Sequence, residues 1–381
     1  MKLLYCIPAL YNAGGMERVL TEKVNFLSNL PNYEIIIVTT DQQGLPIRFE
    51  LDKRIQIIHL DIDFNGHFAY NLIKKFILHK HKLKIYRTKL RSLIKDFNVD
   101  ICISLCGKEI EFLDTLPVNC KKIAEIHFAM NNRKQFIISR HKGLLWPLLG
   151  EIRTHQLIHS VQGLDKLVVL THEDKLQWES KHSNVVQIPN PNPLHNTHIS
   201  MLNEKRVITL GKLDVQKGYD MLVDAWELVA LKHPDWKLDI YGIGEWEQML
   251  TNRIVELKLE KTLNLRGLTD DVASEYIKSS IYVMSSRYEG LPMVLIEAMS
   301  CGLPIISFDC EHGPREIIQD GINGYLVPVN NIKQLAEKII FLIEHELIRK
   351  KMGKQATISA LRFSKEPIMK RWIELFETTI K

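Results

Sequence analysis

Short apolar runs alternate with amphipathic helical segments along the whole chain. The apolar runs lie at 3–10, 34–40, 55–60, 101–105, 122–126, 167–170, 207–210, 236–241, 262–265, 281–284 and 303–308. Helical patterns follow several of them, for example at 16–27 and 219–231. Short continuous apolar runs are typical of parallel strands that are buried on both faces. The pattern therefore predicts an α/β fold with doubly wound parallel sheets.

The alternation is interrupted once, by the proline-rich sequence Ile188-Pro-Asn-Pro-Asn-Pro193. Proline can continue neither a helix nor a central strand. The chain has 381 residues, whereas a single hydrophobic core usually stops growing at roughly 250–300 residues. We therefore expect an N-terminal domain at 1–190 and a C-terminal domain at 191–363, with a ligand cleft between them.

Composition narrows the class of protein. The chain is 45% hydrophobic and 25% charged, with a formal net charge of +5, which excludes collagen-like and disordered proteins. Its six cysteines form no Cys-x-x-Cys pair, so we expect buried thiols in a reducing compartment. No run of 18 apolar residues and no secretory signal pattern occurs. We expect a cytoplasmic protein, free or bound peripherally to the inner face of the cell membrane.

The positive charge is concentrated in segment 71–95. Nine lysines and arginines follow one another there without an acidic residue: Lys74, Lys75, Lys80, Lys82, Lys84, Arg87, Lys89, Arg91 and Lys95. Apolar residues interleave with them, and this amphipathic basic pattern suits an anionic membrane surface or an anionic ligand. A solvated helix pair whose apolar side faces its own core is an equally good interpretation. No nucleic-acid-binding motif accompanies the segment, so we expect no nucleic-acid partner.

Two carboxylates stand out in the stretch from Ser285 to Pro304. Pro292 is suited to a helix start and Gly302 to its end, which places Glu289 in the preceding loop and Glu297 inside the helix. Glu297 lies among apolar residues, where a carboxylate needs hydrogen-bond donors, and ribose hydroxyls are suitable donors. A capping carboxylate and a surface ion pair are the structural alternatives for the two.

Lysines and glycines mark the ends of the strands in the second half. Lys212 and Lys217 bracket the loop that follows 207–210, and two ammonium groups at a strand end can hold a diphosphate. Glycines occur at the same place after three successive strands: Gly211, Gly242, Gly244 and Gly267. Together they predict a nucleotide-binding edge.

These motifs carry a family resemblance. Gly14-Gly15-Met-Glu-Arg, Gly211-Lys212, Lys217-Gly218, Gly242-x-Gly244, Glu289-x7-Glu297 and Gly302-Leu-Pro304 resemble retaining glycosyltransferases of the GT-B fold, family 4. The resemblance implies two Rossmann-like domains and a hexosyltransferase of polysaccharide biosynthesis. It implies transfer of a hexose or N-acetylhexosamine from a UDP-sugar to a glycan or lipid-linked acceptor, and a C-terminal helix, 364–381, that packs back on the N-terminal domain.

The resemblance also implies roles for single residues. The residues near the chemistry are His127, Lys212, Lys217 and Glu289. The residues that bind the donor are Gly14, Gly15, Gly211, Gly242, Gly244, Gly267, Leu291, Met293, Val294, Glu297, Gly313 and Glu316. Glu297 corresponds to the ribose ligand. Lys212 departs from the family, because arginine is more common there, and a point charge then replaces a bidentate contact. For His127 alone, a hydrogen-bonded core histidine is the alternative.

We expect no cofactor besides the donor and no metal ion. The one Asp-x-Asp sequence considered, Asp61-Ile-Asp63, follows an early strand away from the donor motifs, and lysine cations can replace a metal. Two alternatives stay open: a nucleotide-sugar epimerase of the same fold, and a non-catalytic subunit that binds nucleotide sugars. A dinucleotide dehydrogenase is disfavoured because no Gly-x-Gly-x-x-Gly follows the first strand.

Overall fold

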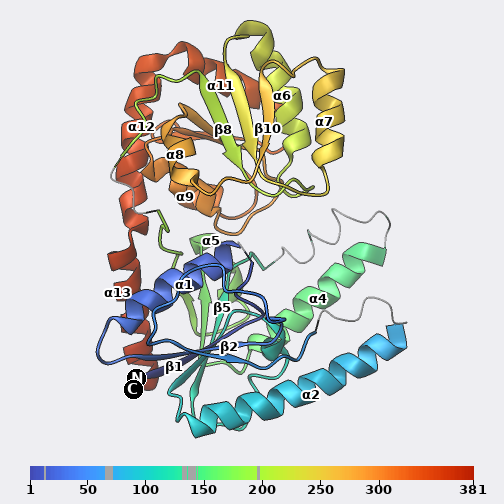
Figure 1. Ribbon diagram of the computed structural model, residues 1–381, viewed down its shortest axis with the longest axis vertical. Coiled ribbons are helices and arrows are strands. Elements are labelled where there is room, and N and C mark those ends of the chain that lie inside the picture. The colour runs from blue at the N-terminus through green and yellow to red at the C-terminus, as the bar shows by residue number, and fades with distance from the viewer. Residues whose placement is uncertain (13, 65–71, 131–134, 136–142, 144, 195–197) are drawn as a thin grey trace. The chain divides into compact units, whose positions relative to one another are not determined.

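The computed structural model describes residues 1–12, 14–64, 72–130, 135, 143, 145–194 and 198–381. The chain divides into two compact units, which Figure 1 colours along the sequence. The first unit contains Met1–Met130, Glu151–Pro193 and Glu366–Lys381. The second contains Leu194–Lys365 together with Asn131–Gly150. The C-terminal segment thus belongs to the same unit as the N-terminus.

The first unit is built on a seven-stranded parallel sheet with the order β3-β2-β1-β4-β5-β6-β7. Its strands are β1 Lys2–Ile7, β2 Glu34–Thr39, β3 Gln56–His59, β4 Ile101–Ser104, β5 Lys121–Ile126, β6 Lys166–Val169 and β7 Val185–Gln187. The helices that lie wholly or mostly in this unit are α1 Gly15–Ser28, α2 Leu72–Asp96, α4 Leu145–Val161, α5 His172–Glu179 and α13 Lys365–Ile380, with a 3-10 turn, η1, at Lys108–Glu111. The strand order reverses between β1 and β4.

Successive residues of these strands point to opposite faces of the sheet, and helices cover both faces. Leu3 and Tyr5 of β1 pack with apolar side chains of α1 and α13. Leu4 and Cys6 of the same strand pack with side chains of α2 and α4. Because both faces are buried, the strands read as continuous apolar runs, which explains why the sequence revealed them.

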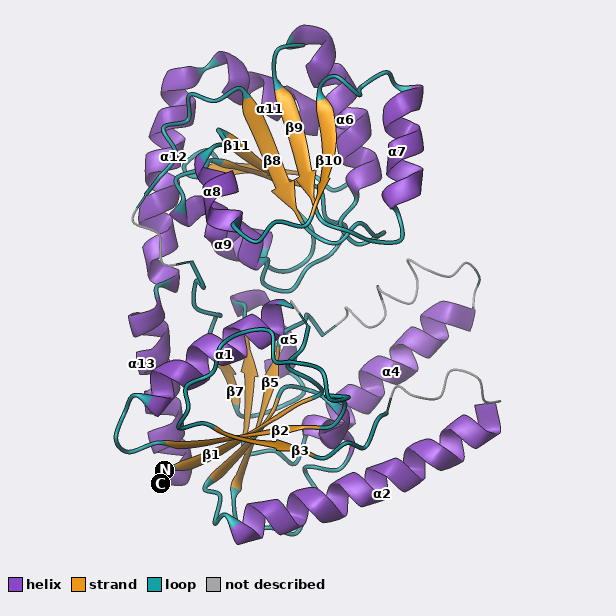
Figure 2. Ribbon diagram, in the orientation of Figure 1, coloured by secondary structure: helices purple, strands orange, loops and turns teal. Residues whose placement is uncertain are grey.

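The second unit contains a six-stranded parallel sheet with the order β10-β9-β8-β11-β12-β13, drawn in Figure 2. Its strands are β8 Arg206–Leu210, β9 Lys237–Tyr241, β10 Leu263–Gly267, β11 Ile281–Met284, β12 Ile305–Phe308 and β13 Gly324–Val327. Its helices are α6 Tyr219–Lys232, α7 Glu247–Glu256, α8 Val272–Ile277, α9 Met293–Ser300, α10 Pro314–Ile317, α11 Ile332–Glu344 and α12 Glu346–Ala360, followed by the 3-10 turn η2 at Leu361–Phe363. The strand order reverses between β8 and β11.

Each sheet has the doubly wound topology that the sequence predicts, and this confirms the α/β fold class. In such sheets ligands bind outside the carboxyl ends of the strands, near the point where the strand order reverses. Predicted site residues of both units follow such strand ends. In the first unit Gly14 follows β1 and His127 follows β5, and in the second unit Lys212 follows β8 and Glu289 follows β11. The fold therefore places the candidate residues of each unit at the edge where a ligand is expected.

One of the two interpretations of the basic segment 71–95, a solvated pair of helices, has the wrong number of helices. This segment forms one continuous helix of 25 residues, α2, and not a pair of helices. The segment contains no proline or glycine that would end a helix before Asp96. Asn71, where the predicted segment begins, lies outside the described residues, as does Ala13 of the predicted turn before α1.

Candidate active site

Two loops of the second unit are joined by hydrogen bonds at the carboxyl edge of the sheet. One follows β8 and the other follows β11. The backbone N–H of Arg287 donates to the carbonyl of Gln216 at 2.8 Å, and the Gln216 side chain donates to the carbonyl of Tyr288 at 3.1 Å. The Ser285 hydroxyl donates to the carbonyl of Lys217 at 2.9 Å. These bonds fix the two loops against each other.

The joined loops bring Lys217 and Glu289 together. Nζ of Lys217 lies 2.7 Å from Oε1 of Glu289, and both side chains are largely buried. Burial disfavours the charged ammonium, but the facing carboxylate of Glu289 outweighs it and raises the pKa of Lys217 above its ordinary value. Residues 72 positions apart thus form a charged pair at the predicted donor edge.

Glu297 lies inside α9, as predicted, and its side chain is buried. The hydroxyl of the fully buried Tyr276 donates to Oε2 of Glu297 at 3.3 Å. Burial, and next the neighbouring Glu297 carboxylate, raise the pKa of Tyr276 well above its ordinary value, so the phenol stays a donor. Tyr276 could not be predicted from the sequence. It belongs to α8, 21 positions away, and nothing in its local sequence points to α9.

Lys212 is arranged differently from Lys217. Its side chain is 63% exposed, and its Nζ lies 3.9 Å from Oδ2 of Asp214. Asp214 closes the turn by accepting from the backbone N–H of Gln216 at 3.0 Å and of Lys217 at 3.4 Å. Lys212 is therefore a long, solvated cation at the rim of a rigid turn, where it is able to reach an anionic ligand.

The glycines after β8 and β9 let these loops pack tightly on one another. A Cβ on Gly242 would lie 1.9 Å from the carbonyl oxygen of Gly211, and a Cβ on Gly244 would lie 2.2 Å from that of Leu213. Gly267, at the end of β10, has a φ of +67° and open space beside it. Close packing of one backbone segment against another thus explains why glycine is needed at positions 242 and 244. The sequence alone did not reveal this.

The loop that contains Gly313 packs against the start of α9. Gly313 has a φ of +90°, and a Cβ there would lie 2.1 Å from the carbonyl oxygen of Gly290. The backbone N–H of Glu316 donates to the carbonyl of Gly313 at 3.0 Å. The structure therefore brings the predicted loop ending in Glu316 beside the predicted donor residues of α9. Of these, Leu291 is buried, whereas Met293 and Val294 are half-buried.

Gly14 and Gly15 form the start of α1 in the first unit. Gly14 is the N-cap residue of the helix, and a Cβ there would lie 2.4 Å from a carboxylate oxygen of Glu17. That carboxylate accepts from the Asn12 side chain at 3.1 Å. No atom lies within 4 Å of a Cβ placed on Gly15. Gly14 thus provides no side-chain cap for the helix, and the Glu17 carboxylate lies beside the helix start.

His127 follows β5 and contacts two polar side chains of the first unit. Its Nε2 lies 3.1 Å from Oε1 of Glu125, and its Nδ1 lies 3.3 Å from the side-chain amide of Asn190. Glu125 in turn pairs with Lys23 of α1. The sequence analysis assigned no role to Glu125, Asn190 or Lys23. A lysine in an amphipathic helix is usually exposed, and its partner lies 102 positions away.

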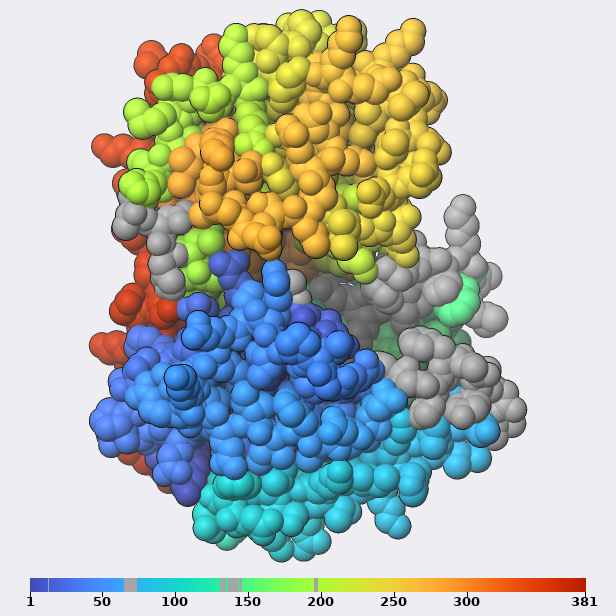
Figure 3. Space-filling view, viewed as in Figure 1, coloured from blue at the N-terminus to red at the C-terminus, as the bar shows by residue number. Residues whose placement is uncertain are grey.

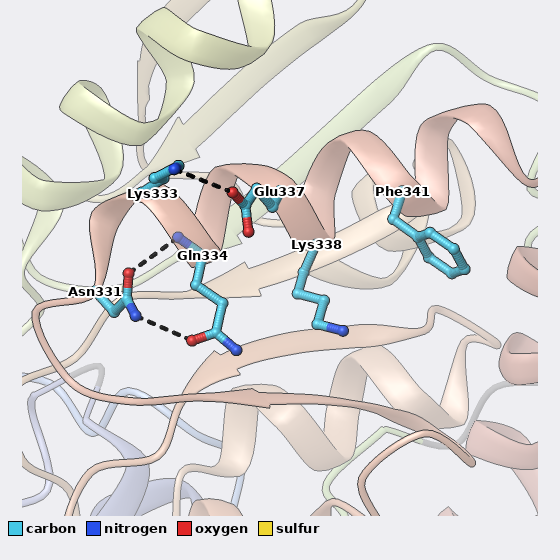
Figure 4. Close-up of a pocket in the computed structure, with 6 residues that line it drawn as sticks. All are labelled: Asn331, Lys333, Gln334, Glu337, Lys338 and Phe341. Carbon is cyan, nitrogen blue, oxygen red and sulfur yellow. Dashed lines mark hydrogen bonds and ion pairs between the residues drawn. The ribbon is translucent and has the colours of Figure 1, made fainter.

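Other features of the described residues fall outside these sites. A hollow lined by side chains of α11 and the residue before it is shown in Figure 4, and none of the predicted site residues lines it. The described residues contain no cluster of three or more histidine, cysteine or acidic side chains arranged to hold a metal ion. Among these residues no helix is both long and apolar enough to cross a bilayer.

Comparisons with known proteins agree with this arrangement. Residues 194–358 match the family Glycosyl transferases group 1. A protein of Haemophilus influenzae described as an uncharacterized glycosyltransferase is 31% identical over 376 residues, which is 97% of this chain and 98% of the relative. The poly(ribitol-phosphate) α-N-acetylglucosaminyltransferase of Staphylococcus aureus is 29% identical over 307 residues, 78% of this chain and 59% of that protein.

Solved structures agree on the fold. A variant of TarM from S. aureus, crystallised with fondaparinux, α-GlcNAc-glycerol and UDP, superposes with a TM-score of 0.79. The match covers 98% of this chain and 99% of TarM at 20% identity. The two parallel-sheet domains and these matches define the class of protein as a GT-B glycosyltransferase. Since the relative from H. influenzae spans nearly the whole chain, the chain belongs to the group 1 glycosyl transferases.

Proposed function

We propose that the protein transfers a hexose or N-acetylhexosamine from a UDP-sugar to a hydroxyl of a glycan or lipid-linked acceptor, as a retaining enzyme of family 4 that builds a polysaccharide. The observation that carries the proposal is the buried pair of Lys217 and Glu289 at the carboxyl edge of the second unit, in loops that precede α6 and α9, with the buried Glu297 inside α9. TarM was crystallised with UDP, and the related S. aureus enzyme is an N-acetylglucosaminyltransferase. Both support the choice of nucleotide and of sugar class.

In this proposal the second unit holds the donor. Glu297, whose buried carboxylate accepts from Tyr276, also accepts hydrogen bonds from the ribose hydroxyls in this proposal. Lys212 and Lys217 hold the diphosphate, and Glu289 lies beside the donor sugar. The glycine loops and the main chain at Leu291, Met293, Val294, Gly313 and Glu316 complete the donor site.

The first unit contributes His127, Gly14 and Gly15 in this proposal. His127 contacts the transferred sugar, and the start of α1 at Gly14 and Gly15 lies near the phosphates and the acceptor. In the reaction, the bond between the anomeric carbon and the diphosphate oxygen breaks. The acceptor oxygen forms the new bond to that carbon, and the proton of the acceptor hydroxyl passes to the leaving diphosphate oxygen.

Negative charge gathers on the leaving diphosphate during this step. Fixed positive charges placed where such charge develops are usually the largest single contribution to catalysis. Lys217 is suited to this because Glu289 orients it and its raised pKa keeps it protonated at neutral pH. With two lysines in this position, we propose that transfer requires neither a metal ion nor another cofactor.

The anomeric configuration of the product tests the proposed retaining mechanism. Proton NMR of a freshly formed glycoside, recorded before any equilibration, distinguishes the α from the β anomer by the coupling of the anomeric proton. We expect the product to have the anomeric configuration of the donor sugar. An inverted product would contradict the retaining mechanism and leave the glycosyltransferase assignment in place.

We further propose that α2 contacts an anionic membrane surface on the cytoplasmic side. Its inner residues Leu83, Tyr86, Leu90 and Ile94 are buried in the first unit, whereas Phe76 and Ile77 are each 63% exposed. The side chains of Lys80, Lys84, Arg91 and Lys95 are also exposed. In Figure 3, α2 lies at the surface of the first unit. Exposed aromatic and aliphatic side chains among lysines suit a negatively charged bilayer surface.

Flotation with vesicles tests this surface. Each added lysine near an anionic bilayer contributes about 1 kcal/mol, so Lys80→Glu/Lys84→Glu should abolish flotation with phosphatidylglycerol vesicles at low salt. The matched control is Lys351→Glu/Lys354→Glu, which makes the same charge change at exposed positions of α12. Equal flotation of both variants and the wild type would contradict a role for α2.

A further inference from the structure

Lys23 and Glu125 form an ion pair inside the first unit. Both residues are fully buried, and Nζ of Lys23 contacts Oε2 of Glu125. Two aromatic rings enclose the ammonium group: Nζ lies 3.9 Å from the centroid of the Trp372 ring and 5.5 Å from that of Tyr5. Trp372 comes from α13, so helices from the two ends of the sequence meet at this pair.

Stability alone is a weak reason for such a pair. Removing two charges from water costs several kcal/mol per ion, and replacing a buried ion pair by apolar residues of similar volume is often neutral or stabilising. The surroundings of Lys23 are apolar and aromatic and would accommodate such a replacement. The buried ion pair is therefore better explained by a role of the second carboxylate oxygen of Glu125, which is not hydrogen-bonded to Lys23.

That second oxygen faces His127. Oε1 of Glu125 and Nε2 of His127 lie 3.1 Å apart. Both atoms are buried, and among the residues that the structure describes neither makes a hydrogen bond of ordinary geometry, so this 3.1 Å contact is the pairing on offer to each. A buried polar atom without a partner costs free energy, so each of these atoms has a strong reason to remain with the other. On the other side of the ring, Nδ1 lies 3.3 Å from the amide of Asn190.

We infer that Lys23 and Glu125 are positioning residues that hold the His127 ring in one orientation and one tautomer. An ionised carboxylate only accepts hydrogen bonds, so Nε2 carries the proton and Nδ1 presents a lone pair. The Asn190 amide faces that lone pair in the present structure, and a hydroxyl of the donor sugar takes its place during transfer. The inference rests on the proposed contact between His127 and the sugar.

The charges around Glu125 agree with this assignment. Burial would raise the pKa of the Glu125 carboxyl, but Lys23 and next His127 outweigh burial and lower the pKa to about 2. The carboxylate is therefore ionised at neutral pH, as a fixed acceptor for Nε2–H must be. Burial lowers the pKa of Lys23 below its ordinary value, and the pairing with Glu125 opposes that change.

Two double variants separate positioning from packing. Lys23→Met/Glu125→Leu removes both charges and the acceptor, whereas Lys23→Met/Glu125→Gln removes both charges and keeps an acceptor for His127. We expect the first to bind UDP like the wild type and to lose about 10- to 100-fold in kcat, as a misplaced contact to the reacting sugar does. The second should stay within about 3-fold of the wild type, because the amide oxygen replaces the carboxylate.

A double-mutant cycle adds a second readout. Residues that act through one another show non-additive effects, so adding His127→Ala to Lys23→Met/Glu125→Leu should cause no further loss of kcat. Lys121→Met is the control, because Lys121 forms a more exposed ion pair with Asp165 at the opposite end of β5. Wild-type kcat in the Leu variant, or losses that add in full, would overturn the inference.

Nitrogen NMR of isotope-labelled histidine tests the inference without any turnover. The His127 signals are assigned by their loss in His127→Ala, and we expect the Nε2–H tautomer in the wild type and its loss in Lys23→Met/Glu125→Leu. An unchanged His127 ring signal in that variant would overturn the inference even if the enzyme is active. Absence of turnover with every donor, alongside the expected tautomer, would instead contradict the proposed function.

Discussion

The proposed role of Glu297, binding the ribose of the donor, can be tested separately from sugar transfer. Its carboxylate is buried and accepts from Tyr276, and hydrogen bonds to a charged group contribute about 1.5–3 kcal/mol each. We expect Glu297→Ala to weaken UDP binding about 10- to 100-fold, measured by isothermal titration calorimetry. Glu289→Ala should retain UDP binding, because the Lys217 ammonium released from Glu289 still contacts the diphosphate, and should lose transfer, because Glu289 is assigned to the sugar.

Tyr276→Phe is the control for this experiment. It removes the intramolecular donor to Glu297 and keeps the carboxylate that is assigned to the ribose, so UDP affinity should change by no more than about 5-fold. Unchanged UDP affinity in Glu297→Ala would contradict the ribose assignment. A loss as large in Tyr276→Phe would show that the effect comes from disturbed packing of α9.

Glu125 makes the stability of the first unit depend on pH. Although burial alone would raise the pKa of its carboxyl, Lys23 and His127 lower it from an ordinary value of 4.5 to about 2. A lowered pKa in the folded state means that this group stabilises the fold above about pH 4.5, and that the contribution is lost as the pH falls towards 2.

Urea denaturation at a series of acidic pH values measures this dependence. The free energy of unfolding of the wild type should fall more steeply between pH 4.5 and 2 than that of Lys23→Met/Glu125→Leu, which lacks the group. Identical slopes for the two proteins would contradict the lowered pKa of Glu125.

The sequence predicted some of these residues and not others for a physical reason. Glu289 and Glu297 lie eight positions apart around one predicted helix start, so a local motif was enough to single them out. Lys23, Glu125 and Tyr276 carry no local motif. Their partners lie far away in the sequence, and only the folded sheet and its covering helices bring them together.

Gly218 lies where the loop after β8 packs closely against the loop after β11. It has a φ of +64°, and a Cβ there would lie 2.1 Å from the carbonyl oxygen of Ser285. Gly218→Ala should cost at least about 2 kcal/mol of stability and should weaken UDP binding, because it pushes apart the loops that carry Lys217 and Glu289. Urea denaturation and calorimetry measure the two effects.

Gly321→Ala is the matched control. Gly321 also has a positive φ, +74°, but no atom lies within 4 Å of a Cβ placed there. It should therefore show only the strain of the left-handed conformation, on the order of 1 kcal/mol, and normal UDP binding. Equal losses in both variants would contradict the argument from close packing of the loops.

Most strands, and the helices predicted at 16–27 and 219–231, could be located from the sequence. Each apolar run of the sequence corresponds to a strand, and the run at 281–284 coincides with β11. The sequence missed β7 and β13, which have three and four residues and are at the edges of their sheets. Short edge strands carry little periodic signal. Charge alone did not show whether 71–95 holds one helix or two, because that depends on the surfaces it covers.

At the level of the whole chain, the sequence pattern predicted two α/β domains, and the family resemblance, not the composition, implied that the C-terminal helix packs back on the first of them. The core of the first unit includes Ile368, Met369, Trp372, Leu375 and Phe376 of α13. The first unit is thus completed only when the last residues of the chain have been added. Composition could not reveal this, since an amphipathic terminal helix fits many surfaces equally well.

The central claim is that this chain is a nucleotide-sugar-dependent transferase, and release of nucleoside diphosphate tests it most directly. Purified protein is incubated with UDP- and GDP-sugars, with and without a panel of glycan and lipid-linked acceptors. We predict that UDP is released from a UDP-hexose or UDP-N-acetylhexosamine only when an acceptor is present, and that Glu297→Ala reduces this release. The claim would be contradicted if no donor yielded a nucleoside diphosphate with any acceptor, or if the nucleotide sugar were converted to its epimer without one.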